Sequence, residues 1–263
     1  HVINELLMGK PLAQLDEDML KFSNMTKEYQ DLVRMEFFIV SWQMLQNFRG
    51  FCDNEMKLKG DVFDEDAFFQ QPPEKLDETM FVVIHGYRQM LAAFFSDFEV
   101  GAIASIKVFD KQLKKTPGVA YLPFSICCGG VCCYAASHAV RSRSKAARYR
   151  RHGDRCRKQL RKWAELGNPN CRHSHALLQA EHKMLRSKYD SAIARFKDAI
   201  DLATSCGFTN DQALANERLS ECLMRMGMDD AADQALDEAI RLYEKWGATG
   251  KVEKLRLARE KYG

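Results

Sequence analysis

The chain is poor in the two residues that form tight turns, with six prolines and 15 glycines among 263 residues. A β-sandwich or β-barrel needs a turn after each of many short strands, and those turns rely on glycine and proline. The scarcity of both residues therefore disfavours an all-β fold. An apolar share of 46% and a charged share of 29% fit an ordered globular chain.

A large charge of one sign is also missing, because the formal net charge is only +3. This value is too small to indicate a nucleic-acid partner by itself. We therefore expect protein partners, or other domains of the same polypeptide, rather than nucleic acid.

No complete catalytic or nucleotide-binding motif is present. The segment GATGK (247–251) resembles the end of a phosphate-binding loop, but that loop needs glycine where Lys245 stands and serine or threonine where Val252 stands. A glycine-rich dinucleotide turn and a kinase catalytic loop are both absent. His138 is followed by Ala139, not by the acidic residue of a histidine-kinase phosphoacceptor. We predict no catalytic and no cofactor-binding residue in this segment.

The nine cysteines do not form the pattern of a disulfide framework. Their number is odd, and they include the adjacent pairs Cys127–Cys128 and Cys132–Cys133. The opening HVINELLMGK lacks the basic flank and apolar core of a secretory leader. These features predict a reducing, cytoplasmic setting in which the thiols serve as small apolar residues.

Two groups of residues could bind a metal ion. CCGGVCC (127–133) places four thiols in an apolar, helix-like stretch, whereas structural zinc prefers Cys-x2–4-Cys pairs in loops. Tight helix packing is therefore the favoured interpretation, with a metal or redox role as the alternative. His173 and His175 have only Cys171 and His182 nearby as further ligands, so capping and packing are favoured for them too. We predict no metal site.

The longest apolar stretch covers residues 119–140. It is interrupted by Pro123, by Gly129 and Gly130, and by Ser137. Such a stretch predicts a buried helix and no membrane span.

One pattern appears twice, forty residues apart, in the last third of the chain. The first copy contains LLQAEHKMLRSKYDSAIARFKDAIDLA and the second contains ERLSECLMRMGMDDAADQALDEAIRLY. Larger residues fill the space between layers, and small residues recur where two helices would cross closely. The small residues are Ala180, Ala192 and Ala199 in the first copy and Ser220, Ala232 and Ala239 in the second. A fixed period of this size indicates stacked pairs of helices. The pattern predicts an all-α fold, specifically a tetratricopeptide-like α-solenoid of antiparallel helical pairs.

Periodicity extends this organisation towards the beginning of the chain. It places five apolar residues near one face of the first long helix: Leu12, Leu15, Met19, Leu20 and Phe22. We predict an N-terminal helical pair at residues 1–50, an acidic aromatic loop at 51–79 and irregular helical-repeat pairs at 80–170. Phe63, Phe68 and Phe69 are expected to pin the loop onto the helices. The two clear repeats occupy 171–250, and a terminal helix occupies 251–263. Because the chain starts with histidine inside a helical pattern, we expect it to be a piece of a longer protein.

One predicted helix is strongly basic. Residues 141–162 contain eleven arginines and lysines and one acid, Asp154. A solvated outer face is one interpretation; an acidic protein surface or a phosphate-rich partner is the other. No aromatic ladder accompanies the basic residues, so base recognition is not expected. The candidate partner-binding basic face consists of Arg148, Arg151, Arg155, Lys158, Arg161 and Lys162.

Several segments resemble one family. They are GDVFDEDAF (60–68), FFSDFE (94–99), LRKWAELGNPNCRHSHALLQAE (160–181), YDSAIARFKDAIDLATSCGFTNDQALANE (189–217) and AIRLYEKWGATGKVEKL (239–255). Together they are similar to the tetratricopeptide-like region of large STAND-type signalling ATPases, multidomain proteins with ATPase, serine/threonine-kinase and sensor histidine-kinase parts. The stretch from Trp163 to Leu255 carries the most specific likeness, and the first sixty residues match only loosely.

The resemblance implies a place in a larger protein, because the family's ATPase and kinase motifs lie outside this chain. We expect a non-catalytic scaffold or regulatory arm that mediates protein–protein interaction within a cytoplasmic signal-transduction ATPase or kinase. ATP and magnesium would be bound by other parts of that protein. Two alternatives remain. The chain could be a structural segment of an ATP-dependent protein kinase or nucleotide cyclase, or it could be a free-standing adaptor.

Overall fold

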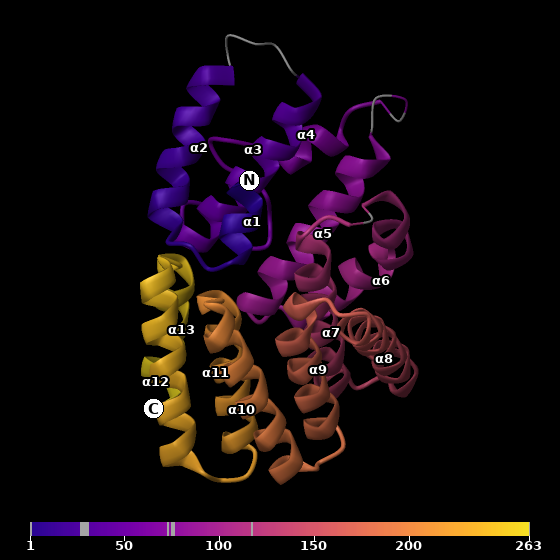
Figure 1. Cartoon of the computed structure of the whole chain (residues 1–263), viewed down its shortest axis with the longest axis vertical. Coiled ribbons are helices and arrows are strands. Elements are labelled where there is room, and N and C mark those ends of the chain that lie inside the picture. Colours follow the sequence, from indigo (N-terminus) through magenta and orange to yellow (C-terminus); the bar gives the residue numbers. More distant parts are fainter. Residues whose placement is uncertain (1, 27–31, 73, 75–76, 117, 263) are drawn as a thin grey trace.

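The structure is a computed structural model that describes residues 2–26, 32–72, 74, 77–116 and 118–262. Within these ranges the chain is all-α, with thirteen α-helices and no β-strand (Figure 1). The helices are α1 (Val2–Leu7), α2 (Leu12–Thr26), α3 (Leu32–Arg49), α4 (Glu65–Phe69), α5 (Glu78–Phe94), α6 (Phe98–Lys115), α7 (Tyr121–Ala139), α8 (Arg143–Glu165), α9 (Arg172–Met184), α10 (Tyr189–Cys206), α11 (Thr209–Met224), α12 (Asp229–Trp246) and α13 (Thr249–Tyr262).

The forty-residue repeat corresponds to two successive pairs, α9 with α10 and α11 with α12. The helices of each pair pack along one another, and α10 also packs against α11. The small residues that the sequence places at helix crossings are all buried: Ala180, Ala192, Ala199, Ser220, Ala232 and Ala239. The alignment of the two copies therefore agrees with the packing.

The turns repeat with the same period as the helices. Ser187 and Gly227, forty residues apart, both adopt a left-handed backbone, with φ of 55° and 70°. Ser96 does the same in the turn between α5 and α6, with φ of 63°. The turns that follow α8, α10 and α12 each contain a left-handed glycine: Gly167, Gly207 and Gly247. A Cβ atom is crowded in this conformation, so the repeat specifies turn geometry as well as packing.

Helix α7 lies at the centre of the fold, against α5, α6, α8 and α9. Its paired glycines permit close packing: a Cβ atom on Gly130 would lie 2.5 Å from Leu178 Cδ1. Among the described residues, α7 is the one helix long and apolar enough to cross a membrane, but 83% of that stretch is buried inside the fold. The predicted buried helix is confirmed.

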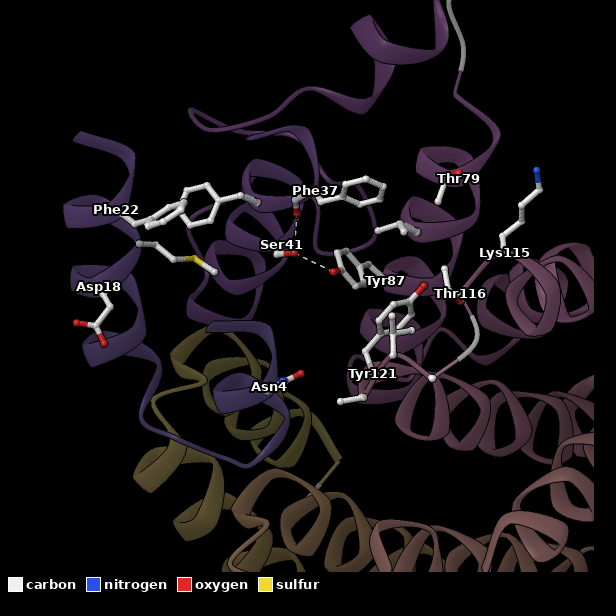
Figure 2. A pocket seen from close by; sticks show the side chains of 16 residues that line it. Asn4, Asp18, Phe22, Phe37, Ser41, Thr79, Tyr87, Lys115, Thr116 and Tyr121 are labelled. Atoms are coloured by element: carbon white, nitrogen blue, oxygen red, sulfur yellow. Dashed lines mark hydrogen bonds between the residues drawn. The ribbon is translucent and has the colours of Figure 1, made fainter. Parts of the chain in front are cut away.

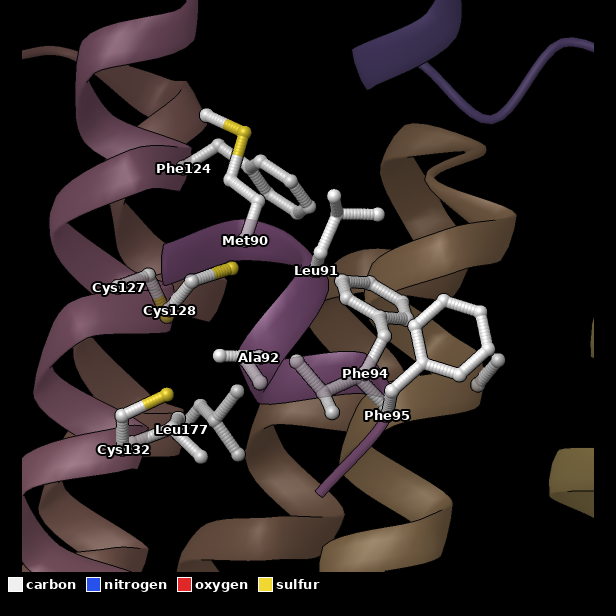
Figure 3. Packing of buried hydrophobic residues seen from close by; sticks show 14 of the residues in the cluster. Met90, Leu91, Ala92, Phe94, Phe95, Phe124, Cys127, Cys128, Cys132 and Leu177 are labelled. Atoms are coloured by element: carbon white, nitrogen blue, oxygen red, sulfur yellow. The ribbon is translucent and has the colours of Figure 1, made fainter. Parts of the chain in front are cut away.

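Helices from the two ends of the sequence meet. Helix α3 packs against α13, and Thr249 Oγ1 donates a hydrogen bond to the carbonyl oxygen of Arg49 over 2.6 Å. The ring of Trp246 lies against Phe48 and Phe94, at centroid distances of 5.0 and 5.6 Å. Figure 3 shows Phe94 and Phe95 at the end of α5, on the side away from Cys127, Cys128 and Cys132. A single apolar core thus joins the first helices to the last.

The N-terminal part differs from expectation in two respects. Helix α1 is present in addition to the two helices expected there. Leu20 and Phe22, expected near the buried face of α2, are 54% and 47% exposed. The reason is that α2 buries only one narrow face, formed by Leu12, Leu15 and Met19.

Part of the acidic aromatic segment 51–79 packs against the core. It contains α4, whose N-cap Asp64 accepts a hydrogen bond from the Asp66 amide over 2.8 Å. Phe68 is buried, and Phe63 and Phe69 pack against the core cluster. The expected role of these aromatic side chains in pinning the segment is confirmed.

Candidate functional site

The six residues of the predicted basic face all lie exposed on α8 (Arg148, Arg151, Arg155, Lys158, Arg161 and Lys162). Ser142 is the N-cap of α8, and its hydroxyl accepts a hydrogen bond from the Lys145 amide. Its opposite side is buried through Tyr149, Cys156 and Leu160. In Figure 1 this helix lies at the edge of the molecule.

Most of the basic face has no acidic partner within the described part of the chain. Arg155 pairs with Asp110 over 2.6 Å and stacks on Phe109 at 4.7 Å, and Arg161 lies 3.7 Å from Glu165. The remaining four cations make no ion pair with any described residue: Arg148, Arg151, Lys158 and Lys162.

Five residues of the basic face form a row along α8. Arg148, Arg151, Arg155, Lys158 and Lys162 are separated by steps of three or four residues, so they lie on one side of the helix. At 1.5 Å per residue, the row from Arg148 to Lys162 is about 21 Å long. A straight row of guanidinium and ammonium groups of this length suits a row of carboxylates or phosphates.

The cysteine cluster takes part in packing. Cys127, Cys128, Cys132 and Cys133 are buried, and burial raises the pKa of each thiol above its usual range. Burial therefore favours the protonated thiol over the thiolate at these four positions. In the described ranges no three or more His, Cys, Asp and Glu side chains are placed to hold a metal ion.

His173 and His175, at the start of α9, face different neighbours. His173 is buried, with Nε2 3.5 Å from Asp211 Oδ2 and its ring against Phe208. The pKa of His175 is lowered by burial and then by the positive charges of Arg157 and Arg161 on α8. The structure does not bring the two rings together into one site.

The lysine of the GATGK segment is already engaged. Lys251 is buried, and its Nζ atom donates a hydrogen bond to Glu217 Oε1 over 2.7 Å. Gly250 packs against the backbone of Gly50. This segment forms the contact between α13 and the end of α3, and its lysine is bonded to Glu217, so the lysine is unable to reach a bound phosphate.

A cavity that the sequence did not predict lies between the N-terminal helices and α5 to α7 (Figure 2). Its volume is about 980 Å³, and five aromatic rings line it: Phe22, Phe37, Phe38, Tyr87 and Tyr121. The adjacent aromatic residues Phe37 and Phe38 were the one sign of this cavity in the sequence. Neighbours on a helix point about 100° apart, so two adjacent aromatics cannot both occupy one narrow buried face.

Three of the hydroxyl groups that line the cavity, those of Ser41, Tyr87 and Thr116, already have hydrogen-bond partners. Ser41 Oγ donates to the Phe37 carbonyl oxygen over 2.7 Å, so the bond of 2.8 Å between Ser41 and Tyr87 has the tyrosine as donor. Burial raises the pKa of Tyr87, which keeps this donor protonated. Thr116 Oγ1 donates to the Gln112 carbonyl oxygen over 2.8 Å.

Comparison with protein-family models, with curated proteins and with solved structures gives no match to this chain.

Proposed function

We propose that this chain is a non-catalytic helical-repeat scaffold that holds a protein partner, or another domain of the same polypeptide, against the basic face of α8. The observation that carries the proposal is the row of four exposed cations without an acidic partner among the described residues. Exposed charges left unpaired at regular spacing are available to an external acidic surface.

The finer fold assignment is part of the same proposal. A tetratricopeptide-like α-solenoid of antiparallel helical pairs is supported by the buried small residues of α9 to α12 and by the turns that recur every forty residues. Proteins built from such stacked pairs present extended surfaces to other proteins.

The composition of the face favours carboxylate over nucleic acid. Four of its six residues are arginines, whose planar guanidinium groups bind carboxylate or phosphate with two parallel hydrogen bonds. The face contains no aromatic side chain on which a base could stack. An acidic helix or acidic loop of a protein is therefore the proposed occupant.

The cellular setting is proposed from the sequence resemblance. In that setting the chain is a regulatory arm of a cytoplasmic signalling ATPase or kinase, and ATP and magnesium bind elsewhere in the protein. The test is the reading frame around this segment. A complete Gly-x4-Gly-Lys-Ser/Thr loop upstream supports the setting, and its absence favours a free-standing adaptor.

Binding can be tested with a fluorescein-labelled helical peptide of alternating glutamate and alanine blocks. We expect 1:1 binding by fluorescence anisotropy, weakened by salt because the contact is electrostatic. Replacing Arg148, Arg151, Lys158 and Lys162 with glutamate should weaken binding at least about tenfold.

A matched control carries the same change of net charge at other exposed sites (Arg186, Lys188, Lys197 and Lys245, all to glutamate). We expect this control to bind within about threefold of the parent, because exposed charges separated by more than a Debye length are largely screened. An equal loss in both variants would show an effect of net charge alone and reject the face. Tighter binding of a 20-base-pair DNA duplex than of the peptide would also reject the proposal.

A further inference from the structure

We infer that the cavity between α2, α3, α5 and α7 binds a small, uncharged aromatic molecule. This inference concerns a site separate from the basic face and does not depend on it. The cavity volume of about 980 Å³ lies at the upper end of the range for small-molecule sites. Such sites are mostly apolar, with a few polar groups.

The charge pattern of the lining excludes a charged ligand. The two charged residues in the lining are Asp18 and Lys115, and both already have partners. Asp18 accepts a hydrogen bond from Lys10 over 3.4 Å, and Lys115 lies 3.0 Å from Glu78. Figure 2 shows their charged ends directed away from the centre of the cavity. A charged ligand would lose its hydration without gaining a counter-ion.

The aromatic lining selects for a flat apolar molecule. Phe22 and Phe38 lie with their ring centroids 5.0 Å apart on one side. Tyr87 and Tyr121 meet edge to face on the other side at 5.9 Å. Figure 2 shows Phe22 across from the two tyrosines, with the ring of Phe37 near Tyr87. Rings on both sides of a gap favour an occupant that itself stacks or makes edge contacts.

Exposure of the rim supports an accessible site. Phe22 is nearly half-exposed although it belongs to this aromatic lining, and Val119 at the start of the segment leading to α7 is 39% exposed. Large apolar side chains left exposed around a concave apolar surface are a sign of a binding site. An aromatic ligand would cover both.

A matched pair of dyes tests the charge argument directly. 1-Anilinonaphthalene has no charge, and 1-anilinonaphthalene-8-sulfonate is the same ring system with one negative charge. Both become fluorescent in apolar surroundings. We expect the uncharged dye to bind with 1:1 stoichiometry and the sulfonate to bind at least about tenfold more weakly.

Substitutions at the cavity test whether the dye binds there. Val119→Trp, at the half-exposed rim, should abolish binding by filling the entrance. Phe22→Ala should weaken binding about three- to tenfold by removing one ring contact. Leu257→Trp, an exposed site on α13, is the control and should leave binding unchanged. Circular dichroism of each variant establishes that the fold is retained.

Three results would overturn the inference. The first is no binding of 1-anilinonaphthalene at its solubility limit. The second is equal binding by the parent and both cavity variants. The third is a dimer in sedimentation experiments that Val119→Trp dissociates, because the cavity would then be a contact surface for a second copy of the chain.

Discussion

Lys251 donates a hydrogen bond from Nζ to Glu217 Oε1 over 2.7 Å, at a position where the lysine side chain is only 1% exposed. The Tyr243 hydroxyl donates to the other carboxylate oxygen over 2.8 Å. These bonds connect the start of α13 to α11 and α12. The lysine that gives the sequence its likeness to a phosphate-binding loop is therefore a structural residue.

Replacing Lys251 with methionine should strongly destabilise the fold. The substitution leaves the Glu217 carboxylate largely buried without its cation, which costs about 3–5 kcal/mol. The double variant Lys251→Met with Glu217→Gln should recover most of the loss, because no unpaired charge remains. Urea unfolding followed by circular dichroism measures both values. A single variant as stable as the parent would contradict the buried ion pair.

The alignment of the two repeats can be tested at Ala192. This residue is buried where α10 crosses its neighbours, so Ala192→Leu should overpack the crossing and cost about 1–3 kcal/mol. Ala194→Leu, two residues further on the exposed side of α10, should change stability by less than about 0.5 kcal/mol. Thermal unfolding of the two variants separates the faces, and equal melting temperatures would show that the assigned faces are wrong.

The recurring turns predict opposite effects at equivalent positions. Ser187 has a positive φ of 55°, so Ser187→Gly should stabilise the protein by up to about 1 kcal/mol by relieving Cβ crowding. Gly227→Ser imposes the same crowding forty residues later and should destabilise by a similar amount. Chemical unfolding of both variants provides the comparison. Destabilisation by Ser187→Gly would argue against a shared turn.

Acid sensitivity should depend on His152. Burial, followed by the nearby charge of Arg155, lowers the pKa of this imidazole to about 4, compared with 6.5 for an exposed histidine. Between pH 6.5 and 4 the unfolded chain therefore binds more protons than the folded chain, so stability falls as the pH falls through this window.

The variant His152→Gln removes this contribution and keeps a group able to bond with Ser105, which lies 3.0 Å from His152 Nε2. From pH 7 to pH 4 we expect the parent to lose about 2–3 kcal/mol more than the variant does. The unfolding free energy at several pH values measures the difference. Parallel pH profiles would mean that His152 does not titrate in this range.

The contact between α3 and α13 can be tested at Gly250. Alanine is normally better than glycine inside a helix by about 1 kcal/mol. Here, however, a Cβ atom on Gly250 would lie 2.7 Å from the backbone of Gly50, and neither backbone can give way cheaply. Gly250→Ala should therefore destabilise the protein, and a gain in melting temperature would show that the two helices do not approach so closely.

The sequence was informative where structure is local. The forty-residue period located buried residues such as Ala199 and Ala239 correctly, because helix packing repeats with the chain. The exposed side of α8 also followed from the spacing of its arginines. The cavity did not follow, because its walls come from α1, α2, α3, α5, α6 and α7, and no local pattern brings Phe22 opposite Tyr121. The partnership of Lys251 with Glu217 likewise depends on the placement of whole helices.

The meeting of α3 with α13 has a mechanical consequence. In a linear repeat array each unit touches only its neighbours, so damage to one end stays local and the array can peel open step by step. Here residues 200 positions apart in the sequence are hydrogen-bonded, and Trp246 shares a core with Phe48. Loss of α13 would uncover α3, and loss of α3 would uncover α13. Unfolding that starts at one end of the helix series therefore also exposes the helices at the other end.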